Sequence, residues 1–164
     1  MKNAMRQARC LTKLLLQRGE TLATAESCTG GLIAKLITDI PGSSAAFPGG
    51  CVTYTNEIKE KLLGVRAETI EKYTEVSLPC AEEMAEGARR ALGAHWGVST
   101  TGYAGPAGGT EADPVGTVYI AVAGETGVFS FRFSAPLGAT RAQVRAAAAK
   151  AALEAVEARM REAR

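Results

Sequence analysis

Apolar residues recur at helical spacing in three long stretches of the chain. The first covers residues 3–18, with Gly19 placed where a helix C-cap is common. The second begins at Ser77 and Pro79, which are typical of an N-cap and a first helical turn. The third starts near Ala139 and forms the last predicted element. Their apolar stripes are Ala4, Ala8, Leu11 and Leu15; Ala81, Met84, Ala85, Ala88 and Leu92; and Ala149, Leu153, Val156 and Met160.

Shorter patterns between these helices predict five strands and three further helices. Residues 118–122 and 129–133 alternate apolar and other residues on either side of a glycine turn, which predicts a hairpin. The other strands are expected over 21–26, 51–54 and 97–101, and the other helices over 28–38, 57–63 and 67–73. Because helices and strands interleave, the pattern predicts an α/β fold, a three-layer α/β/α sandwich with a mixed sheet flanked by helices. We expect a single domain over residues 1–164.

Charge and composition exclude several classes of protein. Lys and Arg number 19 against 17 Asp and Glu, with no dense basic block, so a nucleic-acid partner is not expected. No apolar stretch approaches the ~20 residues of a membrane span. The charges of residues 1–18 are spread throughout, unlike those of a secretory signal, which favours a cytoplasmic protein.

Cysteine and histidine usage argues against a metal site. The four cysteines, at 10, 28, 51 and 80, form no Cys-x-x-Cys pair and are expected to be reduced. A single histidine, His95, makes a zinc site of the usual composition improbable. We therefore expect neither a metal nor another cofactor.

The stretch Ala25–Gly31 places Ser27 between a strand and a helix predicted to start at Cys28. A helix start offers unpaired N–H groups and a partial positive charge, which bind phosphate or stabilise an oxyanion. Gly30 and Gly31 cost ~1 kcal/mol each relative to Ala inside a helix, and close approach of a ligand would explain them. Alternatively, Ser27 only caps the helix and the glycines ease packing. Cys28 is a second candidate nucleophile, although a buried inert cysteine is the more ordinary case.

A serine nucleophile needs a base to take its proton. His95 lies far from any glycine loop in the sequence and suits a surface or packing role. A lysine is the alternative base, as in Ser–Lys hydrolases, if burial or a neighbouring cation lowers its pKa. Lys59 and Lys61 both follow Tyr54 closely, and residue type leaves both open. Each also fits a solvated helix face, and the Tyr54 hydroxyl could share the proton.

Two further stretches are suited to a ligand. Residues 101–110 hold four glycines and a proline directly after a strand, which indicates a backbone shaped around a ligand. They match neither a phosphate-binding P-loop nor a dinucleotide fingerprint, and a plain connecting loop is the alternative. Arg141 and Arg145 lie four apart at the start of the last helix, so they share one face and could bind a phosphate or carboxylate. Two exposed surface arginines are the alternative.

Together these stretches resemble the CinA carboxy-terminal domain family, whose stand-alone members are nicotinamide-nucleotide amidases of the PncC type. The resemblance covers roughly residues 5–160. The matching runs are AESCTGG at 25–31, PGSS at 41–44, GG-x-VTYTNE-x-K at 49–59, LLGV at 62–65, TGYAGPAGGT at 101–110 and PVGTV at 114–118. The resemblance implies an α/β/α fold and a metal-free hydrolysis of nicotinamide mononucleotide to nicotinate mononucleotide and ammonia, a step of pyridine nucleotide salvage.

The resemblance also implies residue roles. Ser27 corresponds to the nucleophile, Lys59 to the base and Tyr54 to its hydroxyl partner. The positions implied to bind substrate are Thr29, Gly30, Gly31, Ser43, Asn56, Thr101, Gly102, Gly105 and Arg141. Two residues depart from the family pattern: Asp113 stands where a lysine is common, and Tyr103 where a smaller aliphatic residue is usual.

Two other functions stay open at this point. One is a non-catalytic nucleotide-binding module that has lost turnover, and the other is a hydrolase that uses Cys28. The joint presence of Ser27, Tyr54 and Lys59 favours the serine enzyme, because a pure binder has no need of all three. We expect a small-molecule nucleotide as the substrate, no membrane partner and a homo-oligomer. Longer family members carry an extra N-terminal domain, which these residues lack.

Overall fold

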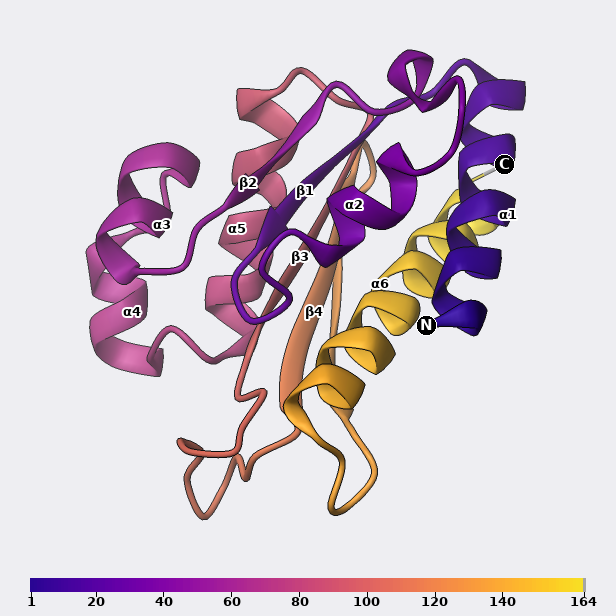
Figure 1. Cartoon of the computed structure of the whole chain (residues 1–164). Helices are drawn as coiled ribbons and strands as arrows, with labels where there is room; N and C mark the ends of the chain where they lie inside the picture. Colours follow the sequence, from indigo (N-terminus) through magenta and orange to yellow (C-terminus); the bar gives the residue numbers. More distant parts are fainter. Residues whose placement is uncertain (164) are drawn as a thin grey trace.

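The sheet of this protein is mixed, with strand β1 (Leu22–Glu26) inside its parallel part. In the computed structural model, which describes residues 1–163, the strand order is β2-β1-β3-β4-β5. β2 (Gly49–Val52) and β3 (Trp96–Gly102) run parallel to β1 on either side of it. β4 (Thr117–Gly124) and β5 (Gly127–Ser134) form the antiparallel hairpin at the other edge (Figure 1). The predicted mixed sheet and terminal hairpin are confirmed.

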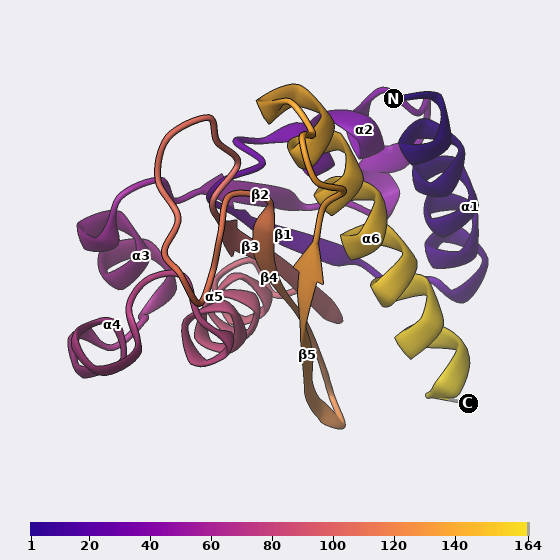
Figure 2. The same ribbon diagram turned by 90° about the horizontal axis from the view of Figure 1, so that it is seen from below.

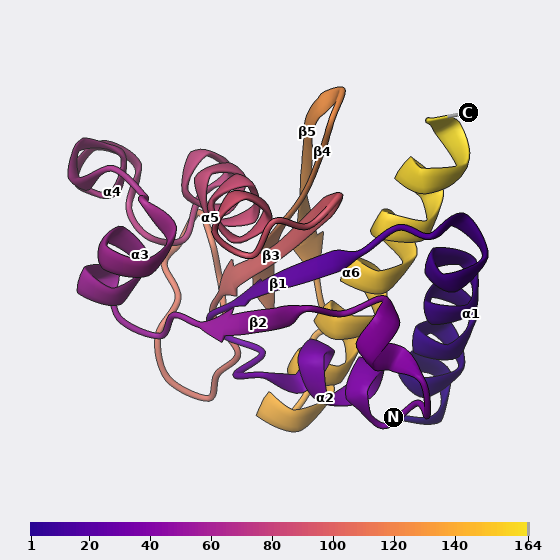
Figure 3. The ribbon, with the colours of Figure 1, turned by 90° about the horizontal axis from the view of Figure 1, so that it is seen from above.

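Helices cover both faces of the sheet, which confirms the predicted three-layer α/β/α arrangement. One face carries α1 (Lys2–Arg18), α2 (Leu32–Thr38) and α6 (Arg141–Glu162), as Figure 2 shows. The other face carries α5 (Leu78–Ala91), with α3 (Asn56–Leu63) and α4 (Ala67–Tyr73) beside it, as the opposite view in Figure 3 shows. A 3-10 turn (Ser43–Ala45) precedes β2. None of the helices in residues 1–163 has the length and apolarity needed to cross a membrane.

The two faces of the sheet differ in the size of their side chains. The face toward α1, α2 and α6 is lined by branched residues such as Ile120, which is fully buried. The face toward α5 presents mainly alanines, including Ala25 and Ala121. At Gly97, a Cβ atom would lie 2.1 Å from the carbonyl oxygen of Ala85 in α5. Helix α5 therefore lies close against β1, β3 and β4, at a distance that larger residues would not allow.

The topology predicts where a ligand site belongs. β1 leads through α2 to β2 on one side, whereas β3 leads directly to β4 on the other. The chain thus leaves the adjacent strands β1 and β3 in opposite directions, which defines a switch point of the sheet. Ligands of open α/β sheets bind outside the carboxyl ends of the strands at such a point.

The helix predicted over 28–38 begins later than expected, at Leu32. Gly30 and Gly31 adopt positive φ angles of 59° and 89°, which glycine tolerates far better than other residues, and they form a turn that precedes the helix. The prediction that Ser27 stands at the start of this helix is therefore wrong. The strand predicted over 51–54 is also displaced, since β2 ends at Val52.

Glu26 takes the place at the amino end of α2 that the sequence analysis gave to Ser27. Its side chain is 1% exposed, and its carboxylate accepts hydrogen bonds from the backbone N–H groups of Ile33 (3.0 Å) and Ala34 (2.8 Å). It also accepts one from the hydroxyl of Thr29 (2.7 Å). The free N–H groups of the helix are thus bound by the protein's own carboxylate, and this helix end does not serve as a phosphate site.

We expect Glu26→Ala to lower the free energy of unfolding by about 2–4 kcal/mol, because two buried N–H groups and a hydroxyl lose a charged acceptor. Urea unfolding followed by circular dichroism measures the change. Glu60→Ala, on the exposed surface of α3, is the control and should change stability by less than about 0.5 kcal/mol. Equal stability of the two variants would show that Glu26 does not hold the turn.

Candidate active site

Residues from the carboxyl ends of β1, β2 and β3 meet around a pocket of about 210 Å³. Ser27 directly follows β1, and Thr101 and Gly102 end β3. Six predicted site residues besides Ser27 line the pocket: Tyr54, Asn56, Lys59, Thr101, Gly102 and Arg141. The structure therefore brings together seven predicted positions that span more than a hundred residues of sequence.

The side chains of Ser27 and Lys59 are in contact. Lys59 Nζ lies 3.1 Å from Ser27 Oγ and donates a hydrogen bond to the carbonyl oxygen of Thr53 at 2.9 Å. Lys59 is 1% exposed on the inner side of α3, whose N-cap is Thr55. Burial lowers the pKa of Lys59, and the Cys80 thiol, the Glu75 carboxylate and the Cys28 thiol oppose that shift. An unprotonated Lys59 at this distance is able to accept the serine proton.

The geometry separates Lys59 from the other candidate bases. Lys61 is exposed in the last turn of α3 and does not line the pocket. His95 lies at the opposite end of the sheet, where its Nδ1 accepts a hydrogen bond from the backbone N–H of Thr21 at 3.1 Å. Of these three side chains, only Lys59 reaches Ser27.

Arg141 and Tyr54 form the outer wall of the pocket. Arg141 donates hydrogen bonds to the Tyr54 hydroxyl (2.9 Å) and to the carbonyl oxygen of Gly105 (2.7 Å). Tyr54 is 59% exposed, and its hydroxyl is bound to Arg141 rather than to Lys59. Arg145, one turn further along α6, donates twice to the carbonyl oxygen of Thr29 and lies outside the pocket. The structure thus places Arg141 at the site and gives Arg145 a role in holding the turn after Ser27.

Five predicted substrate-binding positions do not line the pocket. Thr29 is fully buried, with its hydroxyl on Glu26. Gly30 and Gly31 form the turn in front of α2, and Gly105 lies beside the pocket, where its carbonyl accepts from Arg141. Ser43 lies near the amino end of β1, whereas the pocket lies at the carboxyl end of that strand. The strand is about 16 Å long at about 3.3 Å per residue, which separates Ser43 from the pocket. Direct substrate contact by these five residues stays a prediction.

The segment between α4 and α5 contributes residues that the sequence analysis did not identify. Glu75 and Val76 line the pocket, and the Thr101 hydroxyl donates to the carbonyl oxygen of Glu75 at 2.6 Å. Ala104 and Tyr103, the latter noted only as a departure from the family pattern, line it as well. The one sequence signal in the segment was the N-cap Ser77, which locates a helix start and says nothing about a neighbouring carboxylate.

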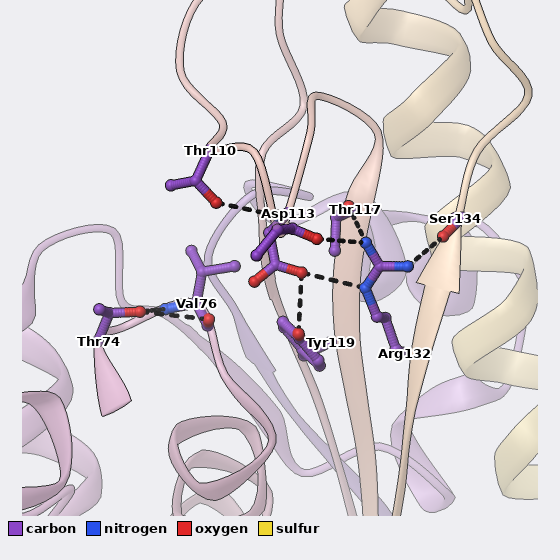
Figure 4. A network of polar contacts seen from close by, with 9 residues as sticks. Thr74, Val76, Thr110, Asp113, Thr117, Tyr119, Arg132 and Ser134 are labelled. Atoms are coloured by element: carbon purple, nitrogen blue, oxygen red, sulfur yellow. Dashed lines mark hydrogen bonds and ion pairs between the residues drawn. The ribbon is translucent and has the colours of Figure 1, made fainter. Parts of the chain in front are cut away.

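The glycine loop after β3 is anchored to the β4–β5 hairpin by a polar network (Figure 4). Asp113 Oδ1 accepts hydrogen bonds from the Tyr119 hydroxyl (2.9 Å) and from Arg132 Nε (3.0 Å). Arg132 also donates to the carbonyl oxygen of Ala112 and to the hydroxyl of Thr117, each at 3.1 Å. Asp113, the other residue that departs from the family pattern, therefore holds the loop and does not line the pocket.

The cysteines are free thiols in different surroundings. Cys28 lines the pocket, but burial raises its pKa to about 12, so the thiol stays protonated near neutral pH. Burial likewise raises the pKa of Cys80 to about 12. Within residues 1–163, no group of three or more His, Cys, Asp or Glu side chains is placed to hold a metal ion.

Curated relatives match most of this chain but are much longer. A CinA-like protein from Synechococcus elongatus is 58% identical over 117 residues, which are 71% of this chain and 28% of that protein. A CinA-like protein from Anaeromyxobacter dehalogenans is 56% identical over 113 residues, 69% of this chain and 28% of that protein. The chain therefore spans less than a third of the length of these curated relatives.

Solved structures match over nearly the whole fold. The competence/damage inducible protein CihA from Agrobacterium tumefaciens superposes with a TM-score of 0.92 at 39% identity, covering 95% of this chain and 94% of that one. The competence damage-inducible protein A (ComA) from Klebsiella pneumoniae gives a TM-score of 0.91 at 33% identity, covering 96% of each chain. The family model of the CinA C-terminal domain matches residues 5–160. The chain therefore belongs to the CinA C-terminal domain family.

Proposed function

We propose that this protein is an amidohydrolase that converts nicotinamide mononucleotide and water to nicotinate mononucleotide and ammonia. The observation that carries the proposal is the contact of 3.1 Å between Ser27 Oγ and the buried Lys59 Nζ. The contact lies at the switch point of the sheet, within a pocket large enough for part of a nucleotide. The family resemblance suggests the substrate, and the side chains supply the chemistry for an amide.

The proposed reaction proceeds through an acyl-enzyme. Unprotonated Lys59 accepts the proton of Ser27 Oγ, which attacks the carboxamide carbon of the substrate. Lys59 then returns that proton to the amide nitrogen as the C–N bond breaks, which releases ammonia and leaves an ester on Ser27. Water, deprotonated by Lys59, hydrolyses the ester and restores the serine hydroxyl. The two steps together consume one water and need no redox partner.

Ser27 suits the role of nucleophile better than Cys28, although both line the pocket. The thiolate is the reactive form of a cysteine, and burial raises the pKa of Cys28 to about 12. Ser27, by contrast, lies within hydrogen-bond distance of a base whose pKa burial lowers.

The guanidinium of Arg141 is the group best placed to receive the phosphate of the substrate. It lines the pocket beside the exposed Tyr54, and planar guanidinium groups bind phosphate in a bidentate manner. Arg145 does not line the pocket and is bound to the carbonyl oxygen of Thr29 in the turn after Ser27. The phosphate would position the carboxamide at Ser27, which is how remote binding energy assists a reaction.

The expected homo-oligomer stays a prediction.

The purified protein should release ammonia from nicotinamide mononucleotide, and Ser27→Ala should reduce that rate by at least about 10³, because the acyl-enzyme cannot form. Cys28→Ala is the matched control and should keep the rate within about threefold, since its thiol stays protonated. A coupled ammonia assay measures all three proteins. Turnover that survives in Ser27→Ala and is lost in Cys28→Ala would exclude the serine mechanism, and binding without any turnover would favour a non-catalytic module.

Lys59→Ala should lower kcat by at least about 10², the range of general base catalysis, whereas Lys61→Ala should leave it unchanged. Since only unprotonated Lys59 accepts a proton, kcat/KM of the unmodified protein should rise with increasing pH. The lowered pKa places that rise below the ordinary lysine value of 10.5. Steady-state kinetics across pH test both points, and an inactive Lys61→Ala would overturn the assignment of the base.

Arg141→Ala should raise KM for the mononucleotide by at least about tenfold, because a guanidinium–phosphate contact is lost. It should change little in the slow hydrolysis of nicotinamide riboside, which lacks the phosphate. Arg145→Ala should instead lower the melting temperature by freeing the turn at Thr29. Equal losses on both substrates for Arg141→Ala would exclude its role at the phosphate.

A further inference from the structure

Glu75 places an acidic side chain in a pocket whose other charged residues are Lys59 and Arg141. The side chain is partly exposed. Among residues 1–163, no cationic nitrogen lies within 4.0 Å of its carboxylate, and no hydrogen bond to that carboxylate is formed. The pocket thus contains a carboxylate that the protein itself leaves without a partner.

The backbone around Glu75 is held in a defined conformation. Thr74 has a φ of 68°, an uncommon value for a residue with a branched side chain. Its hydroxyl is bound to the backbone of Val76 at 3.3 Å (Figure 4), and the Ser77 hydroxyl donates to its carbonyl at 2.9 Å. On the other side, the Thr101 hydroxyl fixes the carbonyl of Glu75 at 2.6 Å. These contacts hold Glu75 at the edge of the pocket.

A carboxylate in this position is unfavourable for the proposed reaction unless the substrate is partly cationic. It repels a phosphate that approaches Arg141. It also raises the pKa of Lys59, against the lowering by burial that a base requires. Both effects are offset if a positive charge from the substrate binds next to Glu75. A nicotinamide ring attached to ribose through its ring nitrogen carries one permanent positive charge.

We propose that Glu75 is a specificity-determining residue that pairs with the pyridinium ring of the substrate, so that the site selects nucleotides with a positively charged ring over those with a neutral one. The inference rests on the proposed amidase function and names the substrate class of that site. In this arrangement Arg141 binds the phosphate, Glu75 faces the ring, and the carboxamide reaches Ser27. The ring charge also cancels the field of Glu75 at Lys59, so substrate binding itself favours the unprotonated base.

The test compares nicotinamide mononucleotide with its dihydro form, whose ring is neutral and whose amide, ribose and phosphate are the same. Glu75→Gln should lower kcat/KM for the cationic substrate by at least about tenfold, mainly through KM. For the dihydro substrate it should leave kcat/KM unchanged or raise it, because the repulsion of the phosphate and the upward shift of the Lys59 pKa are both removed. Glu71→Gln, on the exposed surface of α4 outside the pocket, removes the same charge and should leave both values unchanged. Glu75→Asp keeps the charge and should keep most of the preference.

Equal losses on both substrates, or a fall in kcat at constant KM, would overturn the inference, because neither outcome depends on the charge of the ring. A binding measurement separates this failure from failure of the amidase proposal. Ser27→Ala and the Ser27→Ala/Glu75→Gln double variant are titrated with 1-methylnicotinamide, a cation, and with neutral nicotinamide, followed by NMR. Weaker binding of the cation alone in the double variant supports the inference even if no ammonia is released. Unchanged binding of the cation overturns it even if the protein is an active amidase.

Discussion

The contact between the side-chain nitrogen of Lys59 and the Ser27 hydroxyl depends on burying a lysine almost completely. A charged amine removed from water costs several kcal/mol unless paired, and no carboxylate lies within 4.0 Å of this one among residues 1–163. The amine is held instead by neutral oxygens of Thr53 and Ser27. The fold therefore favours the uncharged amine, which is the form that a base requires. The parallel pairing of β1 and β2 contributes by bringing their carboxyl ends to the same edge of the sheet, so that α3 can place Lys59 against Ser27.

In the turn after β1, neighbouring residues divide between the needs of the fold and those of the proposed active site. Glu26 and Ser27 are adjacent, but Glu26 is directed into the amino end of α2 and Ser27 into the pocket. Arg145 closes the turn from α6 through the Thr29 carbonyl. The position of the Ser27 hydroxyl is thus fixed by contacts that the substrate does not share.

Much of the fold followed from the sequence, because periodicity and turn residues are local signals. The hairpin at 118–133, the N-cap Ser77 and the stripe ending at Met160 were predicted from such signals and are present. The start of α2 was not predicted correctly, because the positive φ angles of Gly30 and Gly31 form a turn before the apolar helical pattern begins. Residue type alone left Lys59 and Lys61 both open as the base, and the family resemblance indicated Lys59. The position of Glu75 at the pocket could not be predicted, because it depends on a contact with Thr101, 26 residues away.

The alanine-lined contact between α5 and the sheet has a consequence for the range of ligands in such folds. With Gly97 and its alanine neighbours leaving no spare volume, helix and strands form an almost incompressible base under the pocket. Adjustment to a differently shaped ligand then has to come from the two flanking loops, residues 74–77 and 103–116. New specificities in this architecture should therefore arise by exchanging loop residues above an unchanged Ser–Lys pair.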